Sequence, residues 1–210
     1  DELKNEITKT TPASFEPTID YVVTKIPRFT FEKFSTSDAI LGTSMKSVGE
    51  AMAIGRNFKE SLQKALVSLE VGFSGLDRIF PLSKKNIEKE LKKNIPNKIL
   101  LVAEAFRKKI NIKRIQTLSK IDKWFLEQIK EIVETENQIK KEGLPKDYNN
   151  FNRVKSMGFS DKKLSEITKK TEETIRKKRT ALKILPVYKK VDTCAAEFKS
   201  FTPYMYSTYQ

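Results

Sequence analysis

Few residues in the sequence have the chemical character of a catalytic site. The 210-residue chain contains no histidine and a single cysteine, Cys194. A Ser–His or Cys–His nucleophile pair, a histidine general base and a Cys/His zinc site are therefore excluded. We expect Cys194 to be a buried structural thiol, because no histidine can activate it. One cysteine cannot form an intramolecular disulfide, which favours a reducing compartment, and no pair of carboxylates stands out as an acid–base pair.

Glu50 is the carboxylate with the most unusual surroundings, because it lies in a stretch of small and apolar residues. Such a carboxylate either pairs with a cation or lines a polar cavity, and residue type alone favours the ion pair. Gly49 and Gly55 flank it, and Arg56 follows. This spacing lacks the Gly-Lys-Ser/Thr sequence of a phosphate-binding loop, so we interpret it as a turn beside a strand.

Residues 158–179 have the pattern of a helix-turn-helix, with a capped helix, a tight turn and a basic second helix. An ordinary helical hairpin with polar outer faces has the same pattern. Arg176 and Arg179 are the only arginines on the second helix, and arginine is the side chain best suited to reading base edges. DNA binding through residues 158–179 is therefore kept as the alternative function.

The net charge of +14 is confined to the middle of the chain. Residues 1–72 carry 9 Lys and Arg against 10 Asp and Glu, residues 73–185 carry 29 against 15, and residues 186–210 carry 3 against 2. Because the basic residues are 33 Lys and only 8 Arg, we expect solvated helix faces and not a nucleic-acid surface. The change in charge near Gly72 and Gly75 predicts a domain boundary.

The elements that must position these residues divide into three segments. In residues 1–72 we expect a strand over 19–26, ended by Pro27, a strand-like stretch over 45–56, and a helix capped by Asn57 with Glu60 three residues later. This segment is predicted to be α/β. No stretch approaches the ~18–20 apolar residues of a membrane span, and the start of the sequence lacks the apolar core of a secretory signal.

Residues 73–185 are predicted to be all-α. Pro96 suits the first position of one helix, and Asp122 can cap a long helix that stops at Gly143. Shorter helices are expected to start near Asp147, Ser160 and Thr171. The inward stripe of the long helix is predicted to be Phe125, Ile129, Ile132, Val133, Glu136 and Ile139. Residues 186–210 lose the helical period and are rich in aromatics, so we expect an extended segment lying along a protein surface.

Six stretches of the chain resemble the large subunit of carbamoyl-phosphate synthase in order and nearly letter for letter. They include Met-Lys-Ser-Val-Gly-Glu at 45–50 and Ile-Asp-Lys-Trp-Phe-Leu at 121–126. The six stretches are residues 11–32, 45–66, 121–126, 158–161, 186–198 and 204–209. Between residues 76 and 120 the likeness is loose, with Lys-rich sequence in place of much of the family's.

The resemblance implies an α+β chain in three parts. Residues 1–72 would be the C-terminal part of the first ATP-grasp (carboxyphosphate) domain, residues 73–185 a helical oligomerisation domain, and residues 186–210 a connector to the next domain. It also implies a parent ligase in the cytoplasm that makes carbamoyl phosphate from bicarbonate, glutamine-derived ammonia and two ATP, for arginine and pyrimidine synthesis.

The same resemblance implies no catalytic, nucleotide-binding or metal-binding residue in this chain, because the family's ATP and Mg²⁺ (or Mn²⁺) ligands fall outside the matched stretches. It places Met45 and Glu50 on the wall of an internal tunnel for carbamate. The implied partners are a glutaminase small subunit and further copies of the chain, with no nucleic acid and no membrane. The isolated chain is expected to be structural and inactive.

Overall fold

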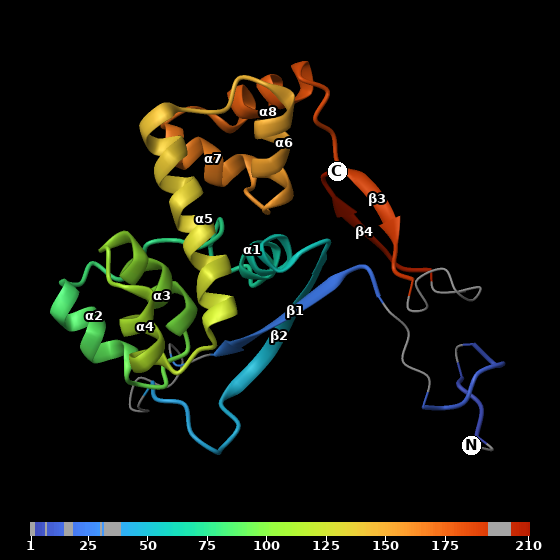
Figure 1. Cartoon of the computed structure of the whole chain (residues 1–210), viewed down its shortest axis with the longest axis horizontal. Coiled ribbons are helices and arrows are strands. Elements are labelled where there is room, and N and C mark those ends of the chain that lie inside the picture. The colour runs from blue at the N-terminus through green and yellow to red at the C-terminus, as the bar shows by residue number, and fades with distance from the viewer. Residues whose placement is uncertain (1–2, 7, 15–18, 30, 32–38, 193–202) are drawn as a thin grey trace.

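The computed structural model describes residues 3–6, 8–14, 19–29, 31, 39–192 and 203–210. Their elements in chain order are β1 (Val22–Phe29), β2 (Ser47–Gly55), α1 (Phe58–Ser68), α2 (Lys84–Leu91), α3 (Lys98–Arg107), α4 (Ile112–Ser119), α5 (Lys123–Glu142), α6 (Tyr148–Ser156), α7 (Asp161–Thr168), α8 (Glu172–Ala181), β3 (Val187–Lys190) and β4 (Met205–Thr208). Over these residues the fold is α+β. The long helix α5 runs between one group of helices, α2–α4, and another, α6–α8 (Figure 1).

Strands β1 and β2 form an antiparallel pair that packs against α1. The predicted second strand is confirmed, but the bounds of the first were wrong, because β1 runs through Pro27 and ends at Phe29. Pro27 lies opposite Glu50. In a two-stranded sheet each strand is an edge strand, and an edge tolerates a residue that lacks an amide hydrogen.

Helix α1 begins as its sequence predicts. Asn57 Oδ1 accepts a hydrogen bond from the Glu60 amide at 2.9 Å, and the Glu60 carboxylate accepts one from the Arg56 amide at 2.8 Å. The first bond satisfies an amide that the first turn of a helix leaves without a partner, and the second joins the Glu60 carboxylate to the residue that precedes the cap. Helix α1 buries Leu62 and Leu66 in the same hydrophobic core as the helices that follow it.

The caps predicted at Asp122 and Thr171 are confirmed, the helices expected to start near Asp147 and Ser160 are capped by these residues, and Gly143 ends α5. Pro96, however, does not start a helix. Helix α3 begins at Lys98, and the Lys98 amide bonds the Ile95 carbonyl at 3.3 Å. Pro96 therefore occupies the second position of a turn before the helix, where its fixed φ is also favourable.

The inward stripe of α5 was predicted correctly except at its start. Phe125 is 41% exposed, and its ring packs edge-on against Phe58 of α1 and Trp124, with centroids 5.1 and 5.0 Å apart. Glu136 faces inward and pairs with the buried Arg107 at 2.6 Å. The buried apolar residues of α5 are Leu126, Ile129, Ile132, Val133 and Ile139.

Strands β3 and β4 form a second antiparallel hairpin beside α1 and α6 (Figure 1). Within the described residues after 186, that is 187–192 and 203–210, the expected extended character is confirmed by these two strands. Across the part of the chain that the structure describes, no helix is both long and apolar enough to span a membrane.

Candidate functional site

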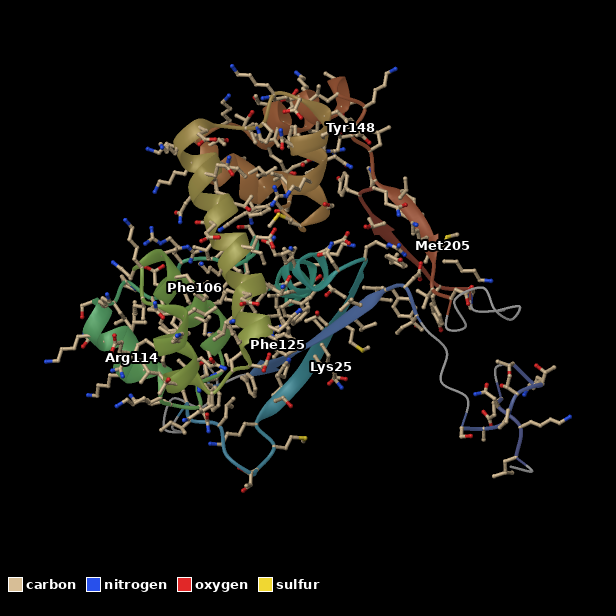
Figure 2. The ribbon with its side chains drawn as sticks, viewed as in Figure 1. Lys25, Phe106, Arg114, Phe125, Tyr148 and Met205 are labelled. Atoms are coloured by element: carbon tan, nitrogen blue, oxygen red, sulfur yellow. The ribbon has the colours of Figure 1, made fainter. Side chains whose placement is uncertain are left out.

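Glu50, one of the two residues that the family resemblance places on a tunnel wall, lies on the outer face of the β1–β2 hairpin. Glu50 on β2 and Lys25 on β1 form an ion pair with 2.7 Å between Oε2 and Nζ, and both side chains are about half exposed, at 50% and 56%. The ion-pair interpretation of Glu50 is therefore confirmed. Figure 2 shows the labelled Lys25 on the side of the hairpin away from the helices.

Apolar side chains surround this ion pair. Val23 and Met52 are exposed on the same strands, and Met45, two residues before β2, is 90% exposed. The opposite face of the hairpin packs on α1, where the Thr24 and Ser61 hydroxyls lie 2.7 Å apart. The outer face is thus apolar with one half-exposed ion pair.

Of the two glycines near Glu50, Gly55 lies in a close contact with α1, whereas a Cβ on Gly49 would meet nothing within 4 Å. A Cβ on Gly55 would lie 2.9 Å from both Glu60 Oε2 and the Ser61 amide nitrogen. Arg56 pairs with Asp20 at the start of the hairpin. The two glycines were interpreted as a turn beside a strand, but both lie within β2, and the chain bends only after Gly55.

The helix-turn-helix pattern corresponds to α7 and α8, joined by a short turn. Arg179, one of the two arginines on α8, is only 9% exposed. Its guanidinium pairs with Asp161 at 3.0 Å and donates to the Ile184 carbonyl at 2.8 Å. Arg176 is exposed and pairs with Glu172 at 3.1 Å. Arg179 is therefore committed to the interior, which leaves one arginine on α8 that faces solvent.

Asp161 belongs to a buried cluster of charges at the junction of α6, α7 and α8. Lys155, 3% exposed, donates to Asp161 at 2.8 Å and to the Phe159 carbonyl at 2.6 Å. Burial acts to raise the pKa of Asp161, but the charges and hydrogen bonds of Lys155 and Arg179 outweigh it, so this pKa lies below its ordinary value. For Lys155, burial is the larger effect and lowers its pKa, although Asp161 opposes the shift.

The C-terminal residues cover this cluster. The Tyr209 ring lies 4.9 Å from Lys155 Nζ and 5.7 Å from the Arg179 guanidinium carbon. Thr208, 1% exposed, donates its hydroxyl to Glu60 of α1 at 2.9 Å. The sequence did not predict this junction, because its members are up to about 150 residues apart and no local pattern connects them.

A cavity of about 560 Å³ lies at the same junction. Its walls come from β2, α1, the turn into α7 and strand β4; among the lining residues are Ile54, Lys64, Phe159, Lys162, Tyr206 and Tyr209. Lys64 of α1 pairs with the buried Glu60 at 3.0 Å.

A second buried ionic network holds α3 against α5. The carboxylate of Glu104 accepts hydrogen bonds from Arg78 at 2.9 and 3.1 Å, and Arg107 pairs with both Glu104 and Glu136. Burial acts to raise the pKa of Glu104, but Arg78 and Arg107 together lower it below its ordinary value. These charges neutralise one another inside the fold, so we assign them a structural role.

No metal centre is formed by the residues that the structure describes, since they contain no group of three or more His, Cys, Asp or Glu arranged to hold an ion. Cys194 lies outside the described residues. The observed arrangement offers surfaces, a cavity and buried ion pairs, and the described residues show no nucleophile with an adjacent base.

The chain matches known proteins along its entire length. The family model for the oligomerisation domain of the carbamoyl-phosphate synthetase large chain matches residues 50–183. The carbamoyl phosphate synthase large chains of Brucella melitensis and Xanthomonas axonopodis are 54% and 52% identical to it, each over 100% of this chain and over 19% and 20% of the relative. An arginine-specific large chain of Oryza sativa subsp. japonica, described as chloroplastic, is 49% identical over 100% of this chain and 18% of its own length. The chain thus spans about a fifth of the length of these relatives.

Proposed function

Because this chain belongs to the family of carbamoyl-phosphate synthase large chains, we propose that it is the central connecting part of such a subunit. The parent enzyme makes carbamoyl phosphate from bicarbonate, ammonia released from glutamine, and two ATP, in the cytoplasm, for arginine and pyrimidine synthesis. The observation that carries this proposal is the identity of 54% over the whole chain.

In this proposal the chain contributes structure and not chemistry. Residues 1–72 close the first ATP-grasp domain, residues 73–185 form the oligomerisation domain, and residues 186–210 connect to the next domain. ATP and Mg²⁺ or Mn²⁺ are bound elsewhere in the parent, where positioned charges stabilise the transferring phosphoryl group. The partners are a glutaminase small subunit and other copies of the large chain.

The outer face of the β1–β2 hairpin is the part that we propose borders the carbamate tunnel, through Met45 and Glu50. This assignment is supported by an exposed apolar surface that surrounds one ion pair. Such a surface is suited to contact with another part of a protein, and the charge of Glu50 is already neutralised by Lys25. Carbamate is an anion, and the paired Lys25 limits its repulsion by Glu50.

The isolated chain tests the catalytic part of the proposal. We expect neither bicarbonate-dependent ATP hydrolysis nor carbamoyl phosphate formation from the purified 210 residues. Bicarbonate-dependent hydrolysis that copurifies with the chain through two chromatographic steps would show that the active residues lie within it and that the connecting role is wrong.

Self-association has a separate test. Sedimentation equilibrium of the chain at increasing concentration is expected to show a reversible rise in mass above 24.2 kDa. A mass that stays at that of one chain at all concentrations would place the oligomeric contact outside these residues.

A further inference from the structure

Residues 203–210, here named the C-terminal strap, contact the molecule at several places, and two of these attachments involve buried charged side chains. The first attachment is to α1. Thr208 is buried and donates to the Glu60 carboxylate at 2.9 Å, and Lys64 donates to the Ser207 carbonyl. Glu60 and Lys64 also pair with each other at 3.0 Å. This part of the strap is therefore held by a single ion pair of α1.

The second attachment is to the helical part, through Tyr209. Beneath its ring, Lys155 and Arg179 share one carboxylate, that of Asp161, so the buried cluster carries an excess positive charge. The face of an aromatic ring attracts a cation, and it does so more strongly where water is excluded. Tyr209 therefore compensates part of the charge that Asp161 leaves unbalanced.

Outside these two attachments the strap touches the rest of the chain at scattered points: the Val191 amide donates to the Tyr204 carbonyl at 2.9 Å, the Tyr148 hydroxyl donates to the Gln210 carbonyl at 3.4 Å, and the buried Tyr206 ring lies 6.3 Å from that of Tyr21. Strand β4 pairs with β3 over four residues, and the side chains of Tyr188, Tyr204 and Met205 are 71, 68 and 66% exposed. A two-stranded hairpin is marginally stable in water by itself. Its docked position therefore depends on the contacts made by Tyr206, Thr208 and Tyr209.

Helix α1 does not need the strap to stay in place. The Gln63 amide donates to the Met157 carbonyl at 2.8 Å, and the Asn57 amide donates to the Ser156 carbonyl at 3.0 Å. The leucines of α1 lie in the main core. Loss of the strap thus leaves the contact between α1 and the α6–α7 turn intact.

We propose that the C-terminal strap is a latch, which leaves the cleft between α1 and the α6–α8 helices as a unit while the helical core stays folded. Tyr206, Ser207 and Tyr209 form one wall of the 560 Å³ cavity, so release of the latch opens that cavity and hydrates the buried charges. Segments with few buried contacts are the ones that open locally in native proteins.

Hydrogen–deuterium exchange of the full chain, followed by mass spectrometry, tests this proposal. Peptides that cover 203–210 are expected to exchange at least about tenfold faster than those of α5, 123–142, through local opening. Tyr209→Leu removes the ring contact and is expected to speed exchange of 203–210 by roughly three- to tenfold, with no change in α5.

Two variants serve as matched controls. Tyr209→Phe keeps the ring above Lys155 and Arg179, so exchange of 203–210 should equal that of the wild type. Tyr204→Leu replaces an exposed tyrosine on the same segment and should have no effect. The latch is overturned if 203–210 and α5 exchange at one rate, if Tyr209→Leu speeds both equally, or if Tyr209→Phe acts like Tyr209→Leu.

Discussion

Replacement of Gly158 by alanine should separate the two reasons for which a glycine is needed at the α6–α7 turn. Gly158 has φ of +90°, a backbone region that side chains disfavour. A Cβ built there lies 2.9 Å from the Cα of Glu60 and 3.0 Å from its carbonyl oxygen. Both are backbone atoms of α1, and a backbone cannot move away as a flexible side chain can.

The expected loss in the free energy of unfolding follows from these two terms. The left-handed backbone costs about 1–2 kcal/mol for a residue with a Cβ. Forcing a methyl group into a packed contact costs about 1–3 kcal/mol more. Gly158→Ala should therefore destabilise the chain by about 2–5 kcal/mol, a large share of the ~5–15 kcal/mol typical of a folded domain.

Gly72→Ala is the matched control. Gly72 has φ of +92°, close to that of Gly158, and nothing lies within 4 Å of a Cβ placed there, so it carries the backbone cost without the steric one. Urea unfolding, followed by circular dichroism and by the fluorescence of Trp124, the single tryptophan, gives both values. Equal losses for the two variants would refute the close approach of α1 to Gly158.

Three further predictions concern other parts of the molecule. Lys120→Gly and Lys169→Gly should each stabilise the chain by about 0.5–1 kcal/mol in urea unfolding, because these C-caps have φ of +61° and +55°. Asp161→Asn should lower the free energy of unfolding by about 3 kcal/mol near pH 7, because it leaves Lys155 and Arg179 without a counter-charge. The folded state lowers the pKa of Asp161 from 3.8. The Asp161 carboxylate therefore contributes its full stability above pH 3.8, and this contribution is lost as the pH falls through the folded pKa. In urea titrations at acid pH, the wild type and Asp161→Asn should accordingly become equally stable. In the proposed parent enzyme, Met45→Trp should reduce carbamoyl phosphate formation while bicarbonate-dependent ATP hydrolysis continues.

Each of these predictions has a control. Lys130→Gly, within α5 and not at a left-handed position, should instead lose about 1 kcal/mol, and a gain there would contradict the cap argument. Glu134→Gln removes an exposed pair with Lys130 at 3.4 Å and should change stability by less than about 0.5 kcal/mol at any pH. Met45→Leu in the parent should leave carbamoyl phosphate formation in step with bicarbonate-dependent ATP hydrolysis, as in the wild type. Equal loss of both reactions in Met45→Trp would point to misfolding and not to a tunnel.

The starts of the helices could be predicted from the sequence because a cap is a local interaction. Asp122 and Ser160 each accept a hydrogen bond from an amide two or three residues later, and no distant residue is needed for that. The first strand was less predictable. Whether Pro27 ends it depends on which side of β1 has a partner, and that is set by the pairing with β2.

The junction beneath the C-terminal strap could not be predicted, for a related reason. Arg179 has the same sequence surroundings as a basic residue on a solvated helix, and nothing near it indicates burial. Its environment is made by Asp161, 18 residues earlier, and by Tyr209 near the end of the chain. Phe125 shows the opposite error, since it was predicted to be buried and is partly exposed. Leu126 takes the inward position on α5, and the Phe125 ring lies at the edge of the core against Phe58 and Trp124.

Four of the lysines that contribute to the net positive charge lie at the ends of helices. Lys109 and Lys120 follow helices α3 and α4, Lys169 and Lys183 follow α7 and α8, and all four have φ between +55° and +61°. A cation near the last turn interacts favourably with the helix dipole, which offsets part of the backbone cost of that φ. Because α3 and α4 lie toward one end of α5 and α7 and α8 toward the other (Figure 1), charges placed at helix ends are dispersed around the helical part. A nucleic-acid surface requires them gathered on one face, so we expect any binding of duplex DNA to be weak and to be lost as salt approaches physiological concentration.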